Sequence, residues 1–539
     1  PVIMNTLRIL VFAVVLGCMA CACSDFFEEE SQNKAYVASL ADLDELLKGE
    51  TYINEEGFST SSYYQGSNNR VMYQTNRYFP WIHVLDDDVT EFAEGYYSSR
   101  DNWIRPNAAS AYTWSANPFT NKDGVEYAAD DWNKAYKRIA VLNSVLYSVN
   151  DFREGESDTL ANRVEGEAAF LRAYYYYWLV NIYAQPYSVE TCGKDLGVPL
   201  KISEVVEDKY FSRNSVKEVY DQIRTDLRRS VVAFKNAEDP ARPNRANYTA
   251  ACILMSRVSL YMEEYEDAIA YADSAIARGR HSILDINGLK PGDSFTYERS
   301  PETAFTMGGY IMNQIHQPDS LGSYSFYPKY SVVSAYKSSD ELLRSYSTND
   351  LRRSIFFASA HWMKSAYHCW KSRETTGRIG DYMLFRIPEA YLIKAECQAI
   401  LGDESGAKQT LNVLREKRFL AGHMPSIESE MVASGEDLVN FVRSERRREL
   451  CYEGHRWFDL RRYAVNSKFP FTKKIRHEVR EWQGAASADG YYTTAGYYEI
   501  DTQNDREVFA FPLPQDEIIF NKGALVQNAA RPKREMVRY

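Results

Sequence analysis

The stretch EGEAAFLRAYYYYWLVNIYAQPY, residues 165–187, carries five aromatic residues in succession, from Tyr174 to Trp178. Successive residues of a helix are turned by about 100°, so five consecutive rings point all round the axis rather than to one side. A binding platform needs its rings on one face, whereas a helix that is hydrophobic all round lies buried between layers. We therefore predict a core helix wedged between neighbouring helices, with tyrosine hydroxyls that reach partners at the edge of the layer.

The composition agrees with a large folded core. The chain has 539 residues, of which 45% are hydrophobic and 25% charged, as in globular proteins. Its 63 basic and 74 acidic residues give a net charge of −11. No basic field is therefore present to attract a polyanion, and nucleic acid is excluded as an expected partner.

Two later stretches of the chain match each other at a constant offset. Aligning Ala268 with Ala407 also places Ser256 on Ala395. Small residues twelve apart, at the closest approach of two antiparallel helices, are typical of a tetratricopeptide repeat. Larger side chains at these positions would hold the two helix axes apart.

The predicted fold is mainly α: a superhelix of degenerate tetratricopeptide-type helix pairs with long irregular loop insertions and a few short β-hairpins. Pro388 marks the start of one helix, and Gly402-Asp403 marks its end. Other helices are predicted at residues 40–47, 130–148, 165–187, 216–234 and 436–463. We expect one domain over residues 24–539, with its scaffold at about 128–279 and 386–463, ligand-binding insertions at about 50–115 and 281–381, and an irregular C-terminal segment at 464–539. Within that last segment, residues 489–500 alternate like a hairpin.

The N-terminus resembles an export signal. An apolar run from Ile9 to Ala22 suits the central region of a secretory signal and is too short to span a bilayer. Cys23 precedes what looks like the start of the mature chain, and Cys18 follows the better lipobox. We predict a lipoprotein signal peptide at residues 1–23 with lipid on Cys23, or on Cys18; a plain secretory signal is the alternative. The remaining cysteines have no paired spacing and are predicted to be small buried residues: Cys192, Cys252, Cys369, Cys397 and Cys451.

Four segments resemble the signatures of the SusD/RagB family of Bacteroidetes outer-membrane lipoproteins. The first is residues 165–187, where Ala184 replaces the usual Gly. The others are RSERRRELCYEGHRWFDLRRY (443–463), RIPEAYLIKAECQAILGD (386–403) and FPLPQDEIIFNKGALVQN (511–528). The resemblance implies a lipid-anchored outer-membrane protein that faces the cell exterior, binds oligosaccharide without a cofactor, and caps a partner TonB-dependent transporter of the SusC type as a lid.

The second signature contains carboxylates spaced by four residues. Glu445, Glu449 and Glu453 would line one helix face, where Arg residues three or four positions away neutralise them. We predict a structural ladder on the surface rather than an acid/base pair. The sequence contains no Gly-x-Ser-x-Gly elbow, His-Glu-x-x-His helix or phosphate loop, so we predict that the protein is not an enzyme.

Aromatic residues on the insertions are the predicted ligand contacts, because a sugar's C–H face packs on a ring while its hydroxyls meet amide or guanidinium groups. Each of them is equally compatible with packing in the core. The predicted contacts are Tyr96, Tyr97, Asn102, Trp103, Arg105, Trp362 and Trp370, whereas Tyr112 and Trp114 look like framework. Replacing Trp103 or Trp362 with Ala is predicted to weaken ligand binding without lowering the melting temperature.

Asp86-Asp87-Asp88 invites a calcium interpretation, but it lacks the Gly and the distal Glu of a calcium loop. A solvated acidic turn without metal is predicted instead. Three other functions stay open: capture of peptides, as in RagB-like proteins, an all-helical carbohydrate-active enzyme, and a structural scaffold that binds only its partner.

Overall fold

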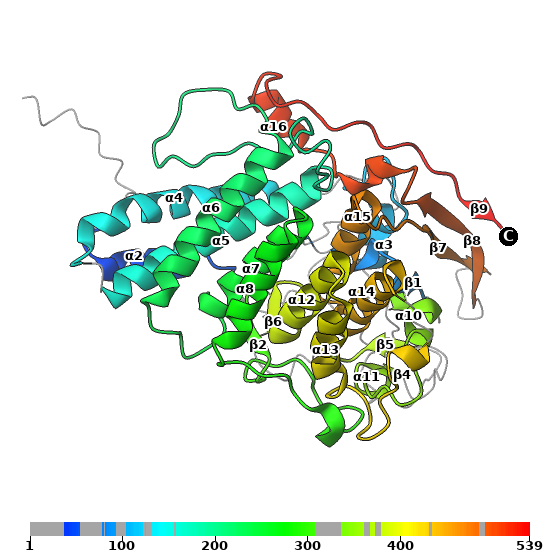
Figure 1. Ribbon diagram of the computed structural model, residues 1–539. Helices are drawn as coiled ribbons and strands as arrows, with labels where there is room; N and C mark the ends of the chain where they lie inside the picture. The colour runs from blue at the N-terminus through cyan, green and yellow to red at the C-terminus, as the bar shows by residue number, and fades with distance from the viewer. Residues whose placement is uncertain are drawn as a thin grey trace, which may run out of the picture.

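The computed structural model is mainly α-helical, as predicted (Figure 1). It describes residues 37–53, 78–79, 81–92, 104–121, 124, 131–155, 158–308, 336–359, 367–371, 379–430, 434–483 and 491–539. None of the helices in these ranges combines the length and the apolar character needed to cross a bilayer.

Helices α2 (Leu40–Glu50), α4 (Asp131–Ser148), α5 (Thr159–Tyr183) and α6 (Val216–Lys235) form one end of the scaffold (Figure 1). Helix α3 (Ile104–Tyr112) lies apart from them, beside the C-terminal part of the chain. The aromatic run lies in α5 and is buried on every side, with Tyr174 to Trp178 at most 2% exposed. Tyr176 donates a hydrogen bond to the carbonyl of Lys201 at 2.9 Å, so a hydroxyl reaches a partner at the edge of the layer. The prediction of a core helix is confirmed.

Close packing of α5 on α6 depends on a glycine. A Cβ atom at Gly166 would lie 2.8 Å from the ring of Phe234, closer than non-bonded carbons approach. The two helices are also joined by a buried ion pair between Arg172 and Asp226. A missing side chain and a paired charge together hold this helix contact.

The next helices continue the superhelix across the molecule (Figure 1). They are α7 (Tyr248–Tyr261), α8 (Tyr265–Ala277), α12 (Ile387–Leu401) and α13 (Glu404–Arg415). Ser256 of α7 donates to the carbonyl of Ala268 in α8 at 2.7 Å, so these two small residues meet where the helices are closest. Pro388 lies in the first turn of α12, and Gly402 ends it at φ 87°, as the sequence predicted.

Enlarging a small residue at this contact should destabilise the fold. Ala268 is fully buried, so we expect Ala268→Leu to lower the free energy of unfolding by about 1–3 kcal/mol through overpacking. Ala270 is exposed on the same helix, and Ala270→Leu should change stability by less than about 0.5 kcal/mol. Urea denaturation of both variants measures the difference; equal values would show that the helix pair tolerates a wider spacing.

The predicted helix at 436–463 is wrong as a single helix. It divides into α14 (Glu436–Leu450) and α15 (Arg456–Val465). Between them Tyr452 and Gly454 adopt φ values of 60° and 75°, which a continuing helix does not allow. The chain changes direction at residues 451–455, so the two halves of the signature lie in different helices.

Short strands and helices occupy the insertions and the C-terminal part. They are β1 (Val89–Glu91), β2 (Thr303–Thr306), β3 (Tyr336–Ser338), α10 (Asp340–Arg344), α11 (Arg352–Ile355), β4 (Phe357–Ser359), β5 (Tyr367–Cys369), β6 (Leu384–Arg386), β7 (Lys474–Gln483), β8 (Tyr491–Asp501), α16 (Gln515–Phe520) and β9 (Val537–Arg538). Antiparallel pairs form between β1 and β3, β2 and β6, and β4 and β5, while β7, β8 and β9 form one sheet. Residues 489–500 are therefore not a hairpin by themselves; most of them belong to β8, whose partner is β7.

The C-terminal sheet is fixed to the scaffold by an aromatic sandwich. His477 of β7 lies between the rings of Tyr112 and Trp114, with ring centroids 4.1 Å from each. Both aromatic residues are at most 2% exposed, in agreement with their predicted framework role. The predicted burial of Cys192, Cys252, Cys369, Cys397 and Cys451 is also confirmed, and none of these five is in a disulfide.

Candidate functional site

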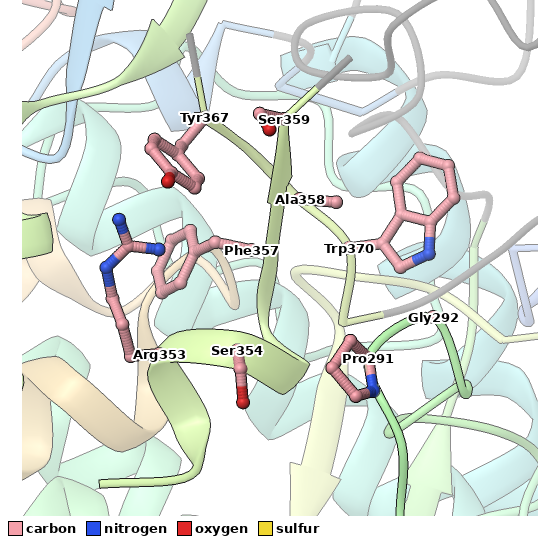
Figure 2. Close-up of a pocket in the computed structure, with 9 residues that line it drawn as sticks. All are labelled: Pro291, Gly292, Arg353, Ser354, Phe357, Ala358, Ser359, Tyr367 and Trp370. Atoms are coloured by element: carbon pink, nitrogen blue, oxygen red, sulfur yellow. The ribbon is translucent and has the colours of Figure 1, made fainter. Parts of the chain in front are cut away.

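A cavity of about 620 Å³ opens on the second insertion, between α11, β4, β5 and a turn at residues 291–292. Its size is within the range of small-molecule sites in proteins. The residues that line it are Pro291, Gly292, Arg353, Ser354, Phe357, Ala358, Ser359, Tyr367 and Trp370. Figure 2 shows Arg353, Phe357 and Tyr367 grouped on one side of β4, with Trp370 across the strand from them.

Strand pairing brings these residues together. In the β4–β5 ladder Ser359 lies opposite Tyr367, and Phe357 lies opposite Cys369. The backbone N–H of Trp370 donates to the carbonyl of Phe356 at 2.6 Å, which fixes Trp370 immediately after the end of β5. Two segments separated in sequence thus build one wall of the cavity.

The guanidinium of Arg353 is held by aromatic rings. Its central carbon lies 4.0 Å from the centroid of the Tyr367 ring and 5.9 Å from that of Phe357. Guanidinium groups stack favourably on aromatic faces and keep their N–H edges free when they do so. The cavity therefore contains aromatic surface, two serine hydroxyls and one oriented cation.

The carboxylate ladder, Glu445, Glu449 and Glu453, lies in α14 and in the turn that follows it. The predicted surface position is wrong, because all three side chains are at most 4% exposed. Each is neutralised, as predicted, but the cations come mostly from other segments than the helix itself. They are Arg352, Lys371, Arg386, Arg415, Arg418 and Arg448.

Two of these cations are the sequence neighbours of cavity residues. Arg352 precedes Arg353 and contacts Glu445 at 3.1 Å and Glu449 at 3.4 Å. Lys371 follows Trp370, pairs with Glu453, and donates to the carbonyl of Glu449 at 2.8 Å. The ladder therefore anchors the backbone next to Arg353 and the backbone next to Trp370, on both sides of the cavity.

The ladder is held in its ionised form. Burial disfavours the charged form of Glu445, but the guanidinium groups of Arg448 and Arg352 bring its pKa to about 2. For Glu449, burial is likewise outweighed by Arg418 and Arg386, and its pKa lies well below the usual range. A general acid needs a raised pKa near the working pH, so these carboxylates are suited to ion pairing rather than to proton transfer.

The Asp86-Asp87-Asp88 turn is buried, so the prediction of a solvated turn is wrong. In the described residues this trio alone brings three ligand atoms of metal-binding type within 4.8 Å of one another. Arg447, Arg456 and Lys473 contact the carboxylates of Asp87 and Asp88 at 2.6–3.2 Å. Burial opposes ionisation of Asp87, but Arg447 and Arg456 hold its pKa well below the ordinary value, whereas burial raises that of Asp86. These three cations compensate the buried negative charge of Asp87 and Asp88.

Of the predicted ligand contacts, the structure places Trp370 in the cavity. Arg105 lies in α3, but its side chain is outside the described part of the structure, as are Cys18 and Cys23. The other predicted contacts also lie outside the described residues: Tyr96, Tyr97, Asn102, Trp103 and Trp362.

Sequence reasoning missed Arg353, Phe357 and Tyr367. Tyr367 stands three residues before Trp370, so its closeness to a predicted contact could have indicated it as a cavity residue. No sequence signal indicated Arg353, because its neighbour Arg352 is also an arginine. Only the fold shows that Arg352 is buried and that Arg353 lines the cavity.

Comparison with known proteins identifies the architecture. A SusD superfamily structure from Bacteroides thetaiotaomicron superposes with a TM-score of 0.62 at 20% identity, covering 91% of this chain and all of that one. A SusD-like carbohydrate binding protein from Bacteroides vulgatus gives 0.62 at 18% identity, covering 92% and 99%. The curated SusD-like protein P38 of Formosa agariphila is 23% identical over 394 residues, which are 64% of this chain and 73% of that protein. The fold is thus that of the SusD superfamily.

Family models extend this result over the sequence. A model of the SusD family matches residues 277–530, and a model described as starch-binding associating with outer membrane matches residues 27–260. Together the two matches cover most of the chain, in agreement with the four signatures. The chain belongs to the SusD/RagB family.

Proposed function

We propose that this protein binds oligosaccharides in the cavity lined by Tyr367, Trp370 and Arg353. The observation that carries the proposal is the combination of aromatic surface with a few fixed polar groups in one cavity. Such a site binds a sugar without catalysing a reaction, since the C–H groups of the sugar ring pack on the aromatic faces. The sugar hydroxyls form hydrogen bonds with serine and guanidinium groups. The starch-binding description of one matching family model and the carbohydrate-binding Bacteroides vulgatus neighbour support a carbohydrate as the ligand.

Membership of the SusD/RagB family extends the proposal to the membrane anchor, the location and the partner of the protein. The protein is anchored to the outer membrane by lipid on Cys23, or on Cys18, faces the cell exterior, and delivers its ligand to a TonB-dependent transporter of the SusC type as its lid. Purification of an affinity-tagged chain from detergent-solubilised outer membranes tests the partner. Co-purification of a TonB-dependent receptor in stoichiometric amount is expected, and recovery of the tagged chain alone would contradict it.

Calorimetric titration of the mature chain, from Ser24, with a panel of oligosaccharides and short peptides tests the cargo. Heat with an oligosaccharide that chromatography recovers intact is the expected result. Heat with peptides alone would assign the protein to the RagB-like peptide-capturing branch. Cleavage of a bound oligosaccharide would show an enzyme, and no binding at all would support the scaffold hypothesis.

Trp370→Ala should weaken binding of the best oligosaccharide by at least about tenfold, because stacking on an aromatic face contributes about 0.5–1.5 kcal/mol beyond the buried area itself. The melting temperature should stay within a few degrees, since Trp370 is only partly buried. Tyr147, which is 62% exposed on α4, provides the matched control through Tyr147→Ala. Unchanged affinity in Trp370→Ala would remove this cavity from the ligand site. The predicted effects of Trp103→Ala and Trp362→Ala are measured in the same titration.

A further inference from the structure

Among the nine described residues that line the cavity, Arg353 alone carries a formal charge. Arginines that contact the carboxylate ladder belong to ion pairs: Arg352 binds Asp350 at 2.7 Å, and Arg386 binds Glu453 at 2.7 Å. Arg353 differs, because within the described ranges its guanidinium meets only the rings of Tyr367 and Phe357. The cavity therefore presents a cation whose countercharge the described protein does not supply.

The neighbouring carboxylate is already occupied. Asp350, three residues before Arg353, accepts from Arg352 through both oxygens, at 2.9 Å to Nε and 2.7 Å to Nη2. The two arginines are thus divided: one guanidinium is buried and fully paired, and the next faces the cavity. Stacking on Tyr367 uses the flat face of the Arg353 guanidinium and leaves its N–H edges for another partner.

We propose that the cavity selects oligosaccharides that carry an anionic group, either a carboxylate or a sulfate ester, which pairs with Arg353. This inference rests on the proposed glycan-binding function and adds the chemical class of the glycan. A planar guanidinium fork matches the two oxygens of a carboxylate or sulfate in a bidentate hydrogen bond. Trp370 borders the same cavity across β4, so both side chains are available to one bound oligosaccharide (Figure 2).

The test compares ligands that differ only in charge. Calorimetry with the mature chain uses two groups of ligands. The first contains galacturonate, glucuronate-containing and alginate oligosaccharides, each compared with its methyl ester. The second contains sulfated galactan oligosaccharides, each compared with its desulfated form. We expect at least one anionic member to bind about 10- to 100-fold more tightly than its neutral counterpart. We also expect that preference to weaken as sodium chloride rises. The two groups of ligands separate carboxylate from sulfate recognition.

Three variants assign the preference to the residue. Arg353→Gln should reduce the anionic preference to about twofold or less and leave the melting temperature unchanged, because no ion pair within the described residues is lost. Arg353→Lys keeps the charge but not the fork, and should retain part of the preference. Arg344→Gln, at an exposed position in α10, should bind as the wild type does.

The outcomes separate this inference from the function on which it rests. Binding of neutral oligosaccharides that depends on Trp370, with no preference for any anionic member, would overturn the charge selection and leave glycan binding intact. An anionic preference that survives in Arg353→Gln would also overturn it. Failure of every oligosaccharide to bind would overturn the proposed function itself.

Discussion

Glu449→Gln is expected to lower the free energy of unfolding by about 3–5 kcal/mol, which is the usual cost of breaking a buried ion pair by removing one partner. Glu449 is fully buried, and its carboxylate lies 2.8 Å from Arg418, 3.0 Å from Arg386 and 3.4 Å from Arg352. Glutamine keeps the shape but removes the charge, so three guanidinium groups lose a shared anion. Urea denaturation followed by tryptophan fluorescence measures the change.

The matched control for this variant is Glu436→Gln on the same helix. Glu436 is exposed at the start of α14, and its replacement should change stability by no more than about 0.5 kcal/mol. A loss below about 1 kcal/mol in Glu449→Gln would show that Glu302 and Glu453, which also contact Arg386, are sufficient to compensate the buried cations.

Lys371→Met should affect both stability and ligand binding. The Lys371 ammonium pairs with Glu453 and donates to the carbonyls of Glu449 and Cys451, at 2.8 and 3.2 Å. Since Glu453 keeps its pair with Arg386, we expect a loss near the lower end for a broken buried pair, about 3 kcal/mol. We also expect about tenfold weaker oligosaccharide binding at 25 °C, because Trp370 is fixed through the backbone of its neighbour.

Lys417→Met is the control, because Lys417 forms an exposed pair with Asp285 and should contribute less than about 1 kcal/mol. Both variants are titrated under conditions where the chain is folded, so that unfolding does not reduce the number of binding sites. Wild-type affinity in Lys371→Met, together with weak binding in Trp370→Ala, would show that the cavity keeps its shape without the anchor.

The helical scaffold was predictable because its signals are local. Periodicity, Pro388 and Gly402, and the small residues Ser256 and Ala268 act within one or two helices, and each has the predicted structural role. The break after α14 was the exception. Gly454 was a visible signal for it, but the regular spacing of the three ladder glutamates favoured a continuous helix.

The burial of the carboxylate ladder was not predictable in the same way. A spacing of four places carboxylates on one helix face, whether that face meets water or guanidinium groups from elsewhere. Here the cations include Arg352, Lys371 and Arg386, which lie 60 or more residues away along the chain. The cavity has the same dependence on distant segments, since Tyr367 reaches Arg353 only through the pairing of β4 with β5. Of the cavity residues, sequence reasoning named only Trp370.

The alternation of neighbouring side chains at the cavity has a consequence for its adaptability. Arg352 and Lys371 face the ladder, while Arg353 and Trp370, one residue away in each case, face the cavity. Residues that maintain the fold and residues that meet the ligand are therefore interleaved in sequence but physically separate. A combinatorial library at positions 353, 354, 359, 367 and 370 would vary the recognition surface and leave every ladder ion pair intact. Such a chain has the means to acquire new specificities by single substitutions at little cost in folding.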